Sequence, residues 1–313
     1  MCLHPTPLFV SSGDLIADRR YQHARDFEAR GDLQAAADLF AQALERAPHF
    51  GSAWFALGEV RERLGDDSAA IEAFARARAA DPDDRHGAAL RLARLGVGDP
   101  AGAMPAAYVR TLFDHYAPRF DQALAELDYR APALLLEAVA CVCRAGGRAM
   151  RWGSMLDLGC GTGLGGAAFR PHVDWLVGVD LSPGMIEQAR RKGLYDRLAT
   201  DDIARFRADA IAGNARFDLV VAADALTYVA GLDGLFAAVA PVLAPGGMFA
   251  FTVETHAGEG VVLGEKLRYA HGADHVRSAL AAAGLTPRHW ASSSTRTESR
   301  LPVPGLLVVV ERQ

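Results

Sequence analysis

Residues 155–163 read Met-Leu-Asp-Leu-Gly-Cys-Gly-Thr-Gly, an apolar stretch that runs directly into closely spaced glycines. The apolar part predicts a short buried strand over Ser154–Leu158, and the residues after the glycines predict a helix over Gly163–Phe169. The glycines let the backbone approach a ligand closely, because no Cβ stands in the way. A helix that begins there presents free amide hydrogens, which suits the carboxylate of an amino-acid-like ligand.

The spacing of the glycines distinguishes between two kinds of ligand. A dinucleotide fingerprint has glycine at the first, third and sixth positions of such a turn. Here the sixth position is Leu164, and Gly163 stands at the fifth. The spacing therefore disfavours a dinucleotide, and a nucleotide-dependent oxidoreductase is kept only as an alternative.

Two acidic residues accompany the turn. Asp157 supplies negative charge near the ammonium group of an amino-acid-like ligand. The next strand, predicted over Trp175–Val179, ends at Asp180, where a carboxylate can accept hydrogen bonds from both hydroxyls of a ribose. Pro183 then begins a helix, as proline commonly does in a first turn. Taken in this order, the features indicate a ligand that combines an amino acid with a nucleoside.

Helices and strands alternate from Ala133 to the end of the sequence. Further helices are predicted over Ala133–Cys143, Pro183–Arg191, Leu232–Leu243 and Ala273–Ala283. Further strands are predicted over Leu194–Thr200, Phe217–Ala222, Met248–Val253, Leu285–Trp290 and Leu306–Glu311. This alternation predicts a doubly wound, mostly parallel sheet of seven strands with helices on both faces. Such a sheet binds its ligand at the carboxyl ends of the strands.

The amino-terminal part of the sequence repeats itself at an interval of 34 residues. The matched pairs are Gly31 and Gly65, Ala36 and Ala70, Phe40 and Phe74, Ala43 and Ala77, and Pro48 and Pro82. The interval is that of a helical hairpin that stacks on copies of itself. The sequence here resembles the tetratricopeptide repeat, most clearly in the second copy, and a helix over Arg85–Leu95 is predicted to cap the array. The repeats fit either a peptide-binding groove or a dimerisation arm and scaffold.

Residues 96–105 are rich in glycine and proline and predict a linker. The segment after it, residues 106–132, places Phe113, Tyr116 and Phe120 on one face of a helix. These aromatic side chains either pack into a core or form a lid over the ligand. We therefore expect helical repeats over 1–98, a linker and lid segment over 99–132, and a second domain over 133–313.

The motifs of residues 106–313 resemble, in their order, the class I S-adenosylmethionine-dependent methyltransferases, and the whole chain is similar to bacterial methyltransferases with amino-terminal tetratricopeptide repeats. The resemblance implies S-adenosylmethionine as cofactor and S-adenosylhomocysteine as product. At the adenine it leaves a choice between Asp201 and Asp202. The cofactor contacts that it implies are Asp157, Gly159, Cys160, Gly161, Gly163, Asp180, Leu181, Met185, Asp202, Ile203, Ala223, Tyr116 and Phe120.

The methyl acceptor is harder to predict, because a sulfonium methyl is already activated and the enzyme mainly positions the acceptor. Polar residues in loops after the later strands are the candidates. Tyr228, His256 and His271 are candidate catalytic groups, and Arg268 and Tyr269 are candidates for binding the acceptor. Residues 222–225, Ala-Ala-Asp-Ala, lack the Asn/Asp-Pro-Pro-aromatic turn of enzymes that methylate planar amino groups, so that class is disfavoured. We expect a small-molecule acceptor, with a modest-sized peptide group as the alternative.

Composition sets the remaining expectations. The formal net charge of −5 argues against a nucleic-acid partner. The spacing of the four cysteines fits neither a metal site nor a disulfide framework. With no apparent signal peptide and no long apolar run, we expect a cytoplasmic protein that does not enter a membrane. The alternative to an active enzyme is a repeat-based interaction scaffold whose second domain binds the cofactor but transfers methyl groups poorly.

Overall fold

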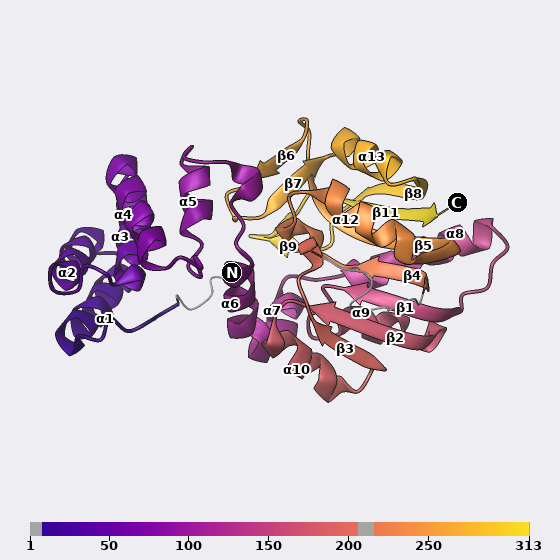
Figure 1. The fold of residues 1–313 in the computed structure, drawn as a ribbon, viewed down its shortest axis with the longest axis horizontal. Coiled ribbons are helices and arrows are strands. Elements are labelled where there is room, and N and C mark those ends of the chain that lie inside the picture. The colour runs from indigo at the N-terminus through magenta and orange to yellow at the C-terminus, as the bar shows by residue number, and fades with distance from the viewer. Residues whose placement is uncertain (1–7, 206–215, 313) are drawn as a thin grey trace. The chain divides into compact units, whose positions relative to one another are not determined.

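The computed structural model describes residues 8–205 and 216–312 (Figure 1). The chain divides into two compact units. The first unit runs to Thr111 and includes Glu265–Leu267, and the second comprises Leu112–Gly264 and the chain from Arg268 onward. Helix α6 (Ala106–Tyr116) continues across residue 111, so the boundaries expected from the sequence remain a prediction. Cys2 lies outside the described residues.

The first unit consists of two helical hairpins and a shorter helix. Its helices are α1 (Leu15–Ala29), α2 (Leu33–Arg46), α3 (Gly51–Arg63), α4 (Asp67–Ala80) and α5 (Ala88–Arg94). Each hairpin turns at a glycine of the repeat, Gly31 or Gly65, with φ of +85° and +78°. Phe40 and Phe74, which occupy equivalent positions in the two repeats, are fully buried. The predicted repeats are therefore confirmed as helical hairpins, and α5 lies within the range predicted for the capping helix.

Ion pairs connect the three helices α1, α3 and α5. Arg63 lies 2.9 Å from Glu28 of α1, and Arg91 of α5 lies 2.7 Å from Glu59 of α3. Arg94 also pairs with a carboxylate of α3. The arginines on this side of the repeats are thus largely neutralised within the unit.

The close contact between Gly58 and Phe74 makes a test of this packing. A Cβ at Gly58 would lie 2.6 Å from the Phe74 ring, whereas a Cβ at Gly51 of the same helix would meet only ordinary contacts from 3.5 Å. We expect Gly58→Ala to lower the free energy of unfolding by about 1–3 kcal/mol, because overpacking forces the ring to move. Gly51→Ala is the matched control and should be neutral or slightly stabilising in chemical denaturation. Equal effects of the two substitutions would contradict this packing.

The second unit is built on one mixed sheet. Its strands are β1 (Trp152–Leu158), β2 (Val173–Asp180), β3 (Arg197–Thr200), β4 (Phe217–Ala222), β5 (Leu243–His256), β6 (Val261–Leu263), β7 (Tyr269–Gly272), β8 (Leu285–Ser293) and β11 (Gly305–Arg312). The main path is β3-β2-β1-β4-β5-β11-β8, in which only β11 pairs antiparallel with its neighbours. These are the seven predicted strands. The sequence analysis missed the short strands β6 and β7, which extend the sheet beside β5.

Helices cover both faces of the sheet, as predicted. They are α8 (Ala131–Ala145), α9 (Leu164–Phe169), α10 (Pro183–Lys192), α12 (Leu232–Val239) and α13 (Ala273–Ala282). Successive residues of a strand point to opposite faces, so Leu156 joins the core with α12 and α13, and Met155 joins the core with α8 and α9.

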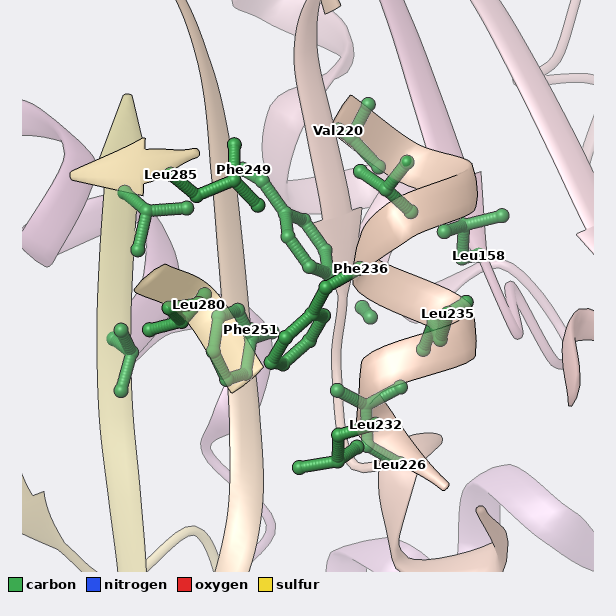
Figure 2. Packing of buried hydrophobic residues seen from close by; sticks show 14 of the residues in the cluster. Leu158, Val220, Leu226, Leu232, Leu235, Phe236, Phe249, Phe251, Leu280 and Leu285 are labelled. Atoms are coloured by element: carbon green, nitrogen blue, oxygen red, sulfur yellow. The ribbon is translucent and has the colours of Figure 1, made fainter. Parts of the chain in front are cut away.

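The core beneath α12 is aromatic. Figure 2 shows Phe236 of α12 pointing toward Phe249 and Phe251, two residues of β5 on the same face of the sheet. The ring centroids of Phe249 and Phe251 are 4.8 Å apart, and that of Phe236 is 5.1 Å from Phe251. This packing fixes β5 against α12 and so defines where the strand reaches the carboxyl edge of the sheet.

The structure corrects the expectation for residues 268–272. The sequence suggested a polar loop, but β7 is a strand that pairs in parallel with the end of β5. Tyr269 and His271 are two residues apart on this strand, so they point to the same face, and both are buried. Within residues 8–205 and 216–312, no helix is both long and apolar enough to span a bilayer.

Candidate functional site

The glycine-rich turn joins β1 to α9 in a conformation that requires glycine. Gly159, Gly161 and Gly163 have φ of +70°, +54° and +94°, values that residues other than glycine rarely adopt. A Cβ at Gly159 would lie 2.4 Å from the Cβ of Ala225, so the loop after β4 packs directly on the turn. A Cβ at Gly161 would lie 3.7 Å from the Phe120 ring, so this backbone lies beneath an aromatic side chain.

Asp180, at the carboxyl end of β2, fixes the turn from the side. Its carboxylate accepts the Gly161 amide at 2.8 Å and the Ser182 amide at 2.9 Å. Burial raises the pKa of Asp180 to about 6, and these two amides oppose that shift. A carboxylate offers about four lone-pair positions, so these amides do not occupy all of them, and the oxygens can still accept from hydroxyl donors of a ligand. The residue therefore fits the predicted role at a ribose.

Asp157 lies beneath the turn rather than at its surface. It is 1% exposed, and its carboxylate accepts the Tyr195 hydroxyl at 2.7 Å. Burial raises the pKa of Asp157 to about 7, and the charge of Asp180 adds to this effect. A buried carboxylate of this kind fits the predicted role at an ammonium group through its charge and not through exposed contact.

Residues 112–126 lie over the turn and the start of α10. They include the end of α6 and helix α7 (Phe120–Glu126). Asp114 accepts the Gly184 amide at 2.9 Å and also bonds to the Ser182 hydroxyl. Asp121 bonds to Thr162 and pairs with Lys192 at 2.6 Å. These bonds attach the covering segment to the amino ends of α9 and α10 and, through Lys192, to the carboxyl end of α10.

The aromatic side chains of the covering segment lie in different surroundings. Tyr116 is buried against Met185, which is packing, and burial raises the pKa of Tyr116 to about 12. Phe120 lies over Gly161, which is the position of a lid. Phe113 makes edge-to-face contact with Tyr228 at 5.1 Å and so connects the segment to the loop after β4.

The remaining cofactor candidates lie at the same edge of the sheet. Asp201 accepts the Asp202 amide at 2.8 Å, and Asp202 accepts the Ala204 amide at 2.9 Å. The side chain of Ile203 lies beside Gly159. Leu181 and Ala223, which follow β2 and β4, are partly exposed, whereas Cys160 is buried, which raises the pKa of its thiol.

A buried ionic network that the sequence did not predict lies beyond β4 and β5. Arg296 is 7% exposed and contacts three carboxylates: Asp224 at 2.6 Å, Glu298 at 2.9 Å and also Glu254. Arg268 pairs with Glu254 and Glu298, each at 2.6 Å. The carboxylates come from three separate segments, so no local sequence pattern reveals the network.

The network fixes a small hairpin over this edge of the sheet. The hairpin is formed by β9 (Thr297–Glu298) and β10 (Leu301–Pro302). The Thr297 amide donates to the Leu127 carbonyl at 2.8 Å, and the Arg130 amide donates to the Thr295 carbonyl at 2.8 Å. The hairpin, and Thr295 just before it, are therefore bonded to Leu127 and Arg130, which follow the covering segment.

The candidate bases occupy three different environments. His271 is fully buried, and desolvation lowers its pKa to about 4. His256 accepts the Gly258 amide at 3.1 Å, and its other ring nitrogen lies 3.3 Å from the Gly260 carbonyl. Tyr228 is partly exposed, and burial raises its pKa, so the phenol keeps its proton at neutral pH.

The two residues predicted to bind the acceptor also have structural surroundings. Arg268 is held by Glu254 and Glu298, and Tyr269 lies buried in β7. Within the described part of the chain, no group of three or more His, Cys, Asp or Glu side chains could hold a metal ion.

The ionic network makes a stability prediction. Arg296→Met should lower the free energy of unfolding by about 3–5 kcal/mol, because it removes the ion-pair partner of buried Asp224 and leaves Glu254 and Glu298 with Arg268 alone. Arg191→Met is the control, since Arg191 pairs with Glu187 on an exposed helix surface and should contribute under about 1 kcal/mol. Urea denaturation of both variants measures the difference. A similar small loss in both would show that the network does not stabilise the fold.

Sequence comparisons agree with these observations. A family model described as a methyltransferase domain matches residues 156–249, and one described as a tetratricopeptide repeat matches residues 21–85. The chain is 48% identical over 88 residues to methyltransferase-like protein 27 of Homo sapiens, and 35% identical over 102 residues to aklanonic acid methyltransferase DauC of Streptomyces sp. (strain C5). These matches cover 28% and 31% of this chain and only 35% and 46% of the two relatives.

Solved structures share the fold. Magnesium protoporphyrin IX methyltransferase from Synechocystis PCC 6803, with bound S-adenosylhomocysteine, superposes with a TM-score of 0.51 at 16% identity, covering 66% of this chain and 99% of that one. The 1,6-didemethyltoxoflavin-N1-methyltransferase of Burkholderia thailandensis also gives 0.51, at 20% identity, covering 69% and 92%.

The second unit thus has the fold of S-adenosylmethionine-dependent methyltransferases. Residues 156–249 match the model of a methyltransferase domain and residues 21–85 that of a tetratricopeptide repeat, which agrees with the resemblance seen in the sequence. These findings support S-adenosylmethionine as the cofactor predicted from the sequence.

Proposed function

We propose that this protein transfers a methyl group from S-adenosylmethionine to a small-molecule acceptor. The observation that carries the proposal is the glycine-rich turn with the Asp180 carboxylate at its side, bonded to the Gly161 amide and still able to accept ligand hydroxyls. S-adenosylmethionine supplies an activated sulfonium methyl group for an in-line displacement. The protein has to hold this cofactor, exclude water and position the acceptor.

Each of these tasks has residues suited to it. The turn and Asp180 bind the cofactor, with Asp157 supplying negative charge from below. Phe120 and the rest of the covering segment exclude water. Tyr228, which stays protonated, donates a hydrogen bond to the acceptor and does not act as a base.

A small acceptor is favoured because the carboxyl edge of the sheet is covered. The covering segment lies over this edge, and the β9–β10 hairpin is bonded to Leu127 directly after it, which leaves little access for a folded macromolecule. Both guanidinium groups of the ionic network are already paired, so they do not favour an anionic acceptor. The relative from Streptomyces takes its name from aklanonic acid, which is consistent with an acceptor of this size.

The tetratricopeptide repeats provide a separate surface for a protein partner or for self-association. Their central charges pair with one another, as between Arg91 and Glu59. We therefore favour partner recognition by shape and apolar contact over recognition of a charged peptide.

Replacement of Asp180 tests cofactor binding. Asp180→Asn keeps the size of the side chain but removes its charge, and we expect about a tenfold or greater loss of S-adenosylmethionine affinity, from hydrogen bonds to a charged acceptor worth roughly 1.5–3 kcal/mol. Asp174→Asn, on the exposed start of the same strand, is the control and should bind normally in isothermal titration calorimetry. Unchanged affinity in Asp180→Asn would overturn the assignment.

Cofactor affinity should also depend on pH. Ligand hydroxyls donate to the ionised form of Asp180, whose pKa is about 6, so binding should weaken as the pH falls from 7 to 5. Asp180→Asn should lose this dependence on a group with pKa near 6. Calorimetry of both proteins over this range measures it, and a pH-independent wild type would contradict the prediction.

The acceptor itself is sought with methyl-labelled cofactor. Incubation with separate metabolite and protein fractions should label the metabolite fraction. Labelling of protein alone would exclude the small-molecule proposal, and tight cofactor binding without any transfer would favour the scaffold alternative.

A further inference from the structure

Tyr195 fills a slot that three glycines leave open. It lies in the loop between α10 and β3, outside the glycine-rich motif. A Cβ at Gly163 would stand 3.0 Å from its ring, one at Gly166 would stand 2.5 Å away, and one at Gly178 would stand 2.7 Å away. The ring therefore sets the spacing between the turn, the first turn of α9 and strand β2.

The hydroxyl of Tyr195 joins two of these elements by hydrogen bonds. It donates to the Asp157 carboxylate at 2.7 Å and accepts the Gly166 amide at 3.1 Å. Asp157 belongs to β1 and Gly166 to α9, so one hydroxyl bridges the strand before the turn and the helix after it.

The loop that carries Tyr195 is itself fixed. The carboxylate of the next residue, Asp196, accepts the Leu176 amide at 2.7 Å and pairs with Arg170 at 2.6 Å. The Asp196 amide donates to the Leu176 carbonyl at 2.9 Å. The tyrosine is thus held by β2 and by the segment after α9, independently of any ligand.

We propose that Tyr195 is a positioning residue for the cofactor, whose hydroxyl holds the Asp157 carboxylate beneath the glycine-rich turn so that its negative charge attracts the cationic amino group of S-adenosylmethionine. The inference rests on the proposed function and adds a residue that no motif in the sequence identifies. Tyr195 acts through Asp157 and does not itself touch the reacting atoms.

The electrostatic surroundings of Asp157 make this role measurable. The pKa of Asp157 is raised to about 7, by burial and by the charge of Asp180. The Tyr195 hydroxyl and the Gly166 amide act in the opposite direction and keep the pKa from rising further. Loss of the tyrosine hydroxyl should therefore raise the pKa of Asp157 above 7.

Two other titratable groups lie near Asp157, and neither of them loses its proton near pH 7. The Cys160 thiol in the turn and the Tyr129 phenol before α8 both have pKa values raised by burial and by the charge of Asp157. Both therefore stay protonated near pH 7, and the carboxylates of Asp157 and Asp180 dominate the response to pH.

The decisive variant is Tyr195→Phe, which keeps the ring in its slot and removes only the hydroxyl. If the pKa of Asp157 moves from about 7 to about 8, S-adenosylmethionine should bind about fivefold more weakly at pH 7 and as tightly as to wild type at pH 9. Calorimetry between pH 6 and pH 9 measures this. An equal loss at every pH would mean that the hydroxyl has only a structural role and would overturn the proposal.

Two controls separate the roles of Tyr195 and Asp157. Asp157→Asn should remove the dependence on a group with pKa near 7, and adding Tyr195→Phe to it should have little further effect on affinity if the hydroxyl acts through that charge. Additive losses in the double variant would contradict the proposal. If Tyr195→Phe fails to fold, 3-fluorotyrosine at position 195 replaces it as the test, because its hydroxyl is a stronger hydrogen-bond donor. It should lower the pH midpoint of cofactor binding, and an unchanged pH midpoint would overturn the inference.

A measurement without cofactor distinguishes this inference from the proposed function. NMR of the Asp157 carboxyl carbon in the ligand-free protein gives the pKa of this side chain. We expect that pKa to be higher in Tyr195→Phe than in wild type. If the pKa of Asp157 differs between the two proteins but wild type does not bind S-adenosylmethionine, the proposed function and the cofactor role of Tyr195 are both refuted. Only the hydrogen bond between Tyr195 and Asp157 would then stand. Wild-type protein that binds the cofactor, with a variant that shows no shift, would refute the role of Tyr195 alone.

Discussion

The bond between the Asp180 carboxylate and the Gly161 amide connects the two strand ends on which the site is built. It fixes the turn after β1 relative to the loop after β2, at 2.8 Å between donor and acceptor. Without it, a turn of glycines would have wide conformational freedom, since glycine loses more entropy on ordering than other residues. The same carboxylate begins the loop in which Ser182 caps α10, so one side chain organises both halves of the ligand site.

Two buried polar systems flank that bond, and they differ in character. On the β2 side, the Tyr195 hydroxyl donates to the Asp157 carboxylate beneath the turn. This hydrogen bond favours the negative charge of Asp157, which acts on the ligand. On the β5 side, Arg296 and its carboxylates form a wider network that attaches surface segments to the sheet. The first system adjusts the binding of a ligand, and the second maintains the shape of the covered edge.

The sequence predicted the turn, Asp180, the seven main strands and the repeats, because each depends on local spacing or a short periodicity. It did not predict β7, since Tyr269 and His271 look polar in sequence and become buried only through pairing with β5. Arg296 was also missed, because its partners are contributed by distant segments. The candidate cofactor residues could be named from motifs, whereas Tyr195 is defined by three glycines that only the folded chain brings together.

The dependence of Arg296 on Asp224, Glu254 and Glu298 limits how the acceptor side can change. These carboxylates follow β4, end β5 and lie in the β9–β10 hairpin, respectively. Grafting a foreign hairpin alone would remove Glu298, and a graft that also replaced Arg296 would leave Asp224 without its ion-pair partner. The three segments must therefore change together if the network is to be kept, in evolution as in protein engineering.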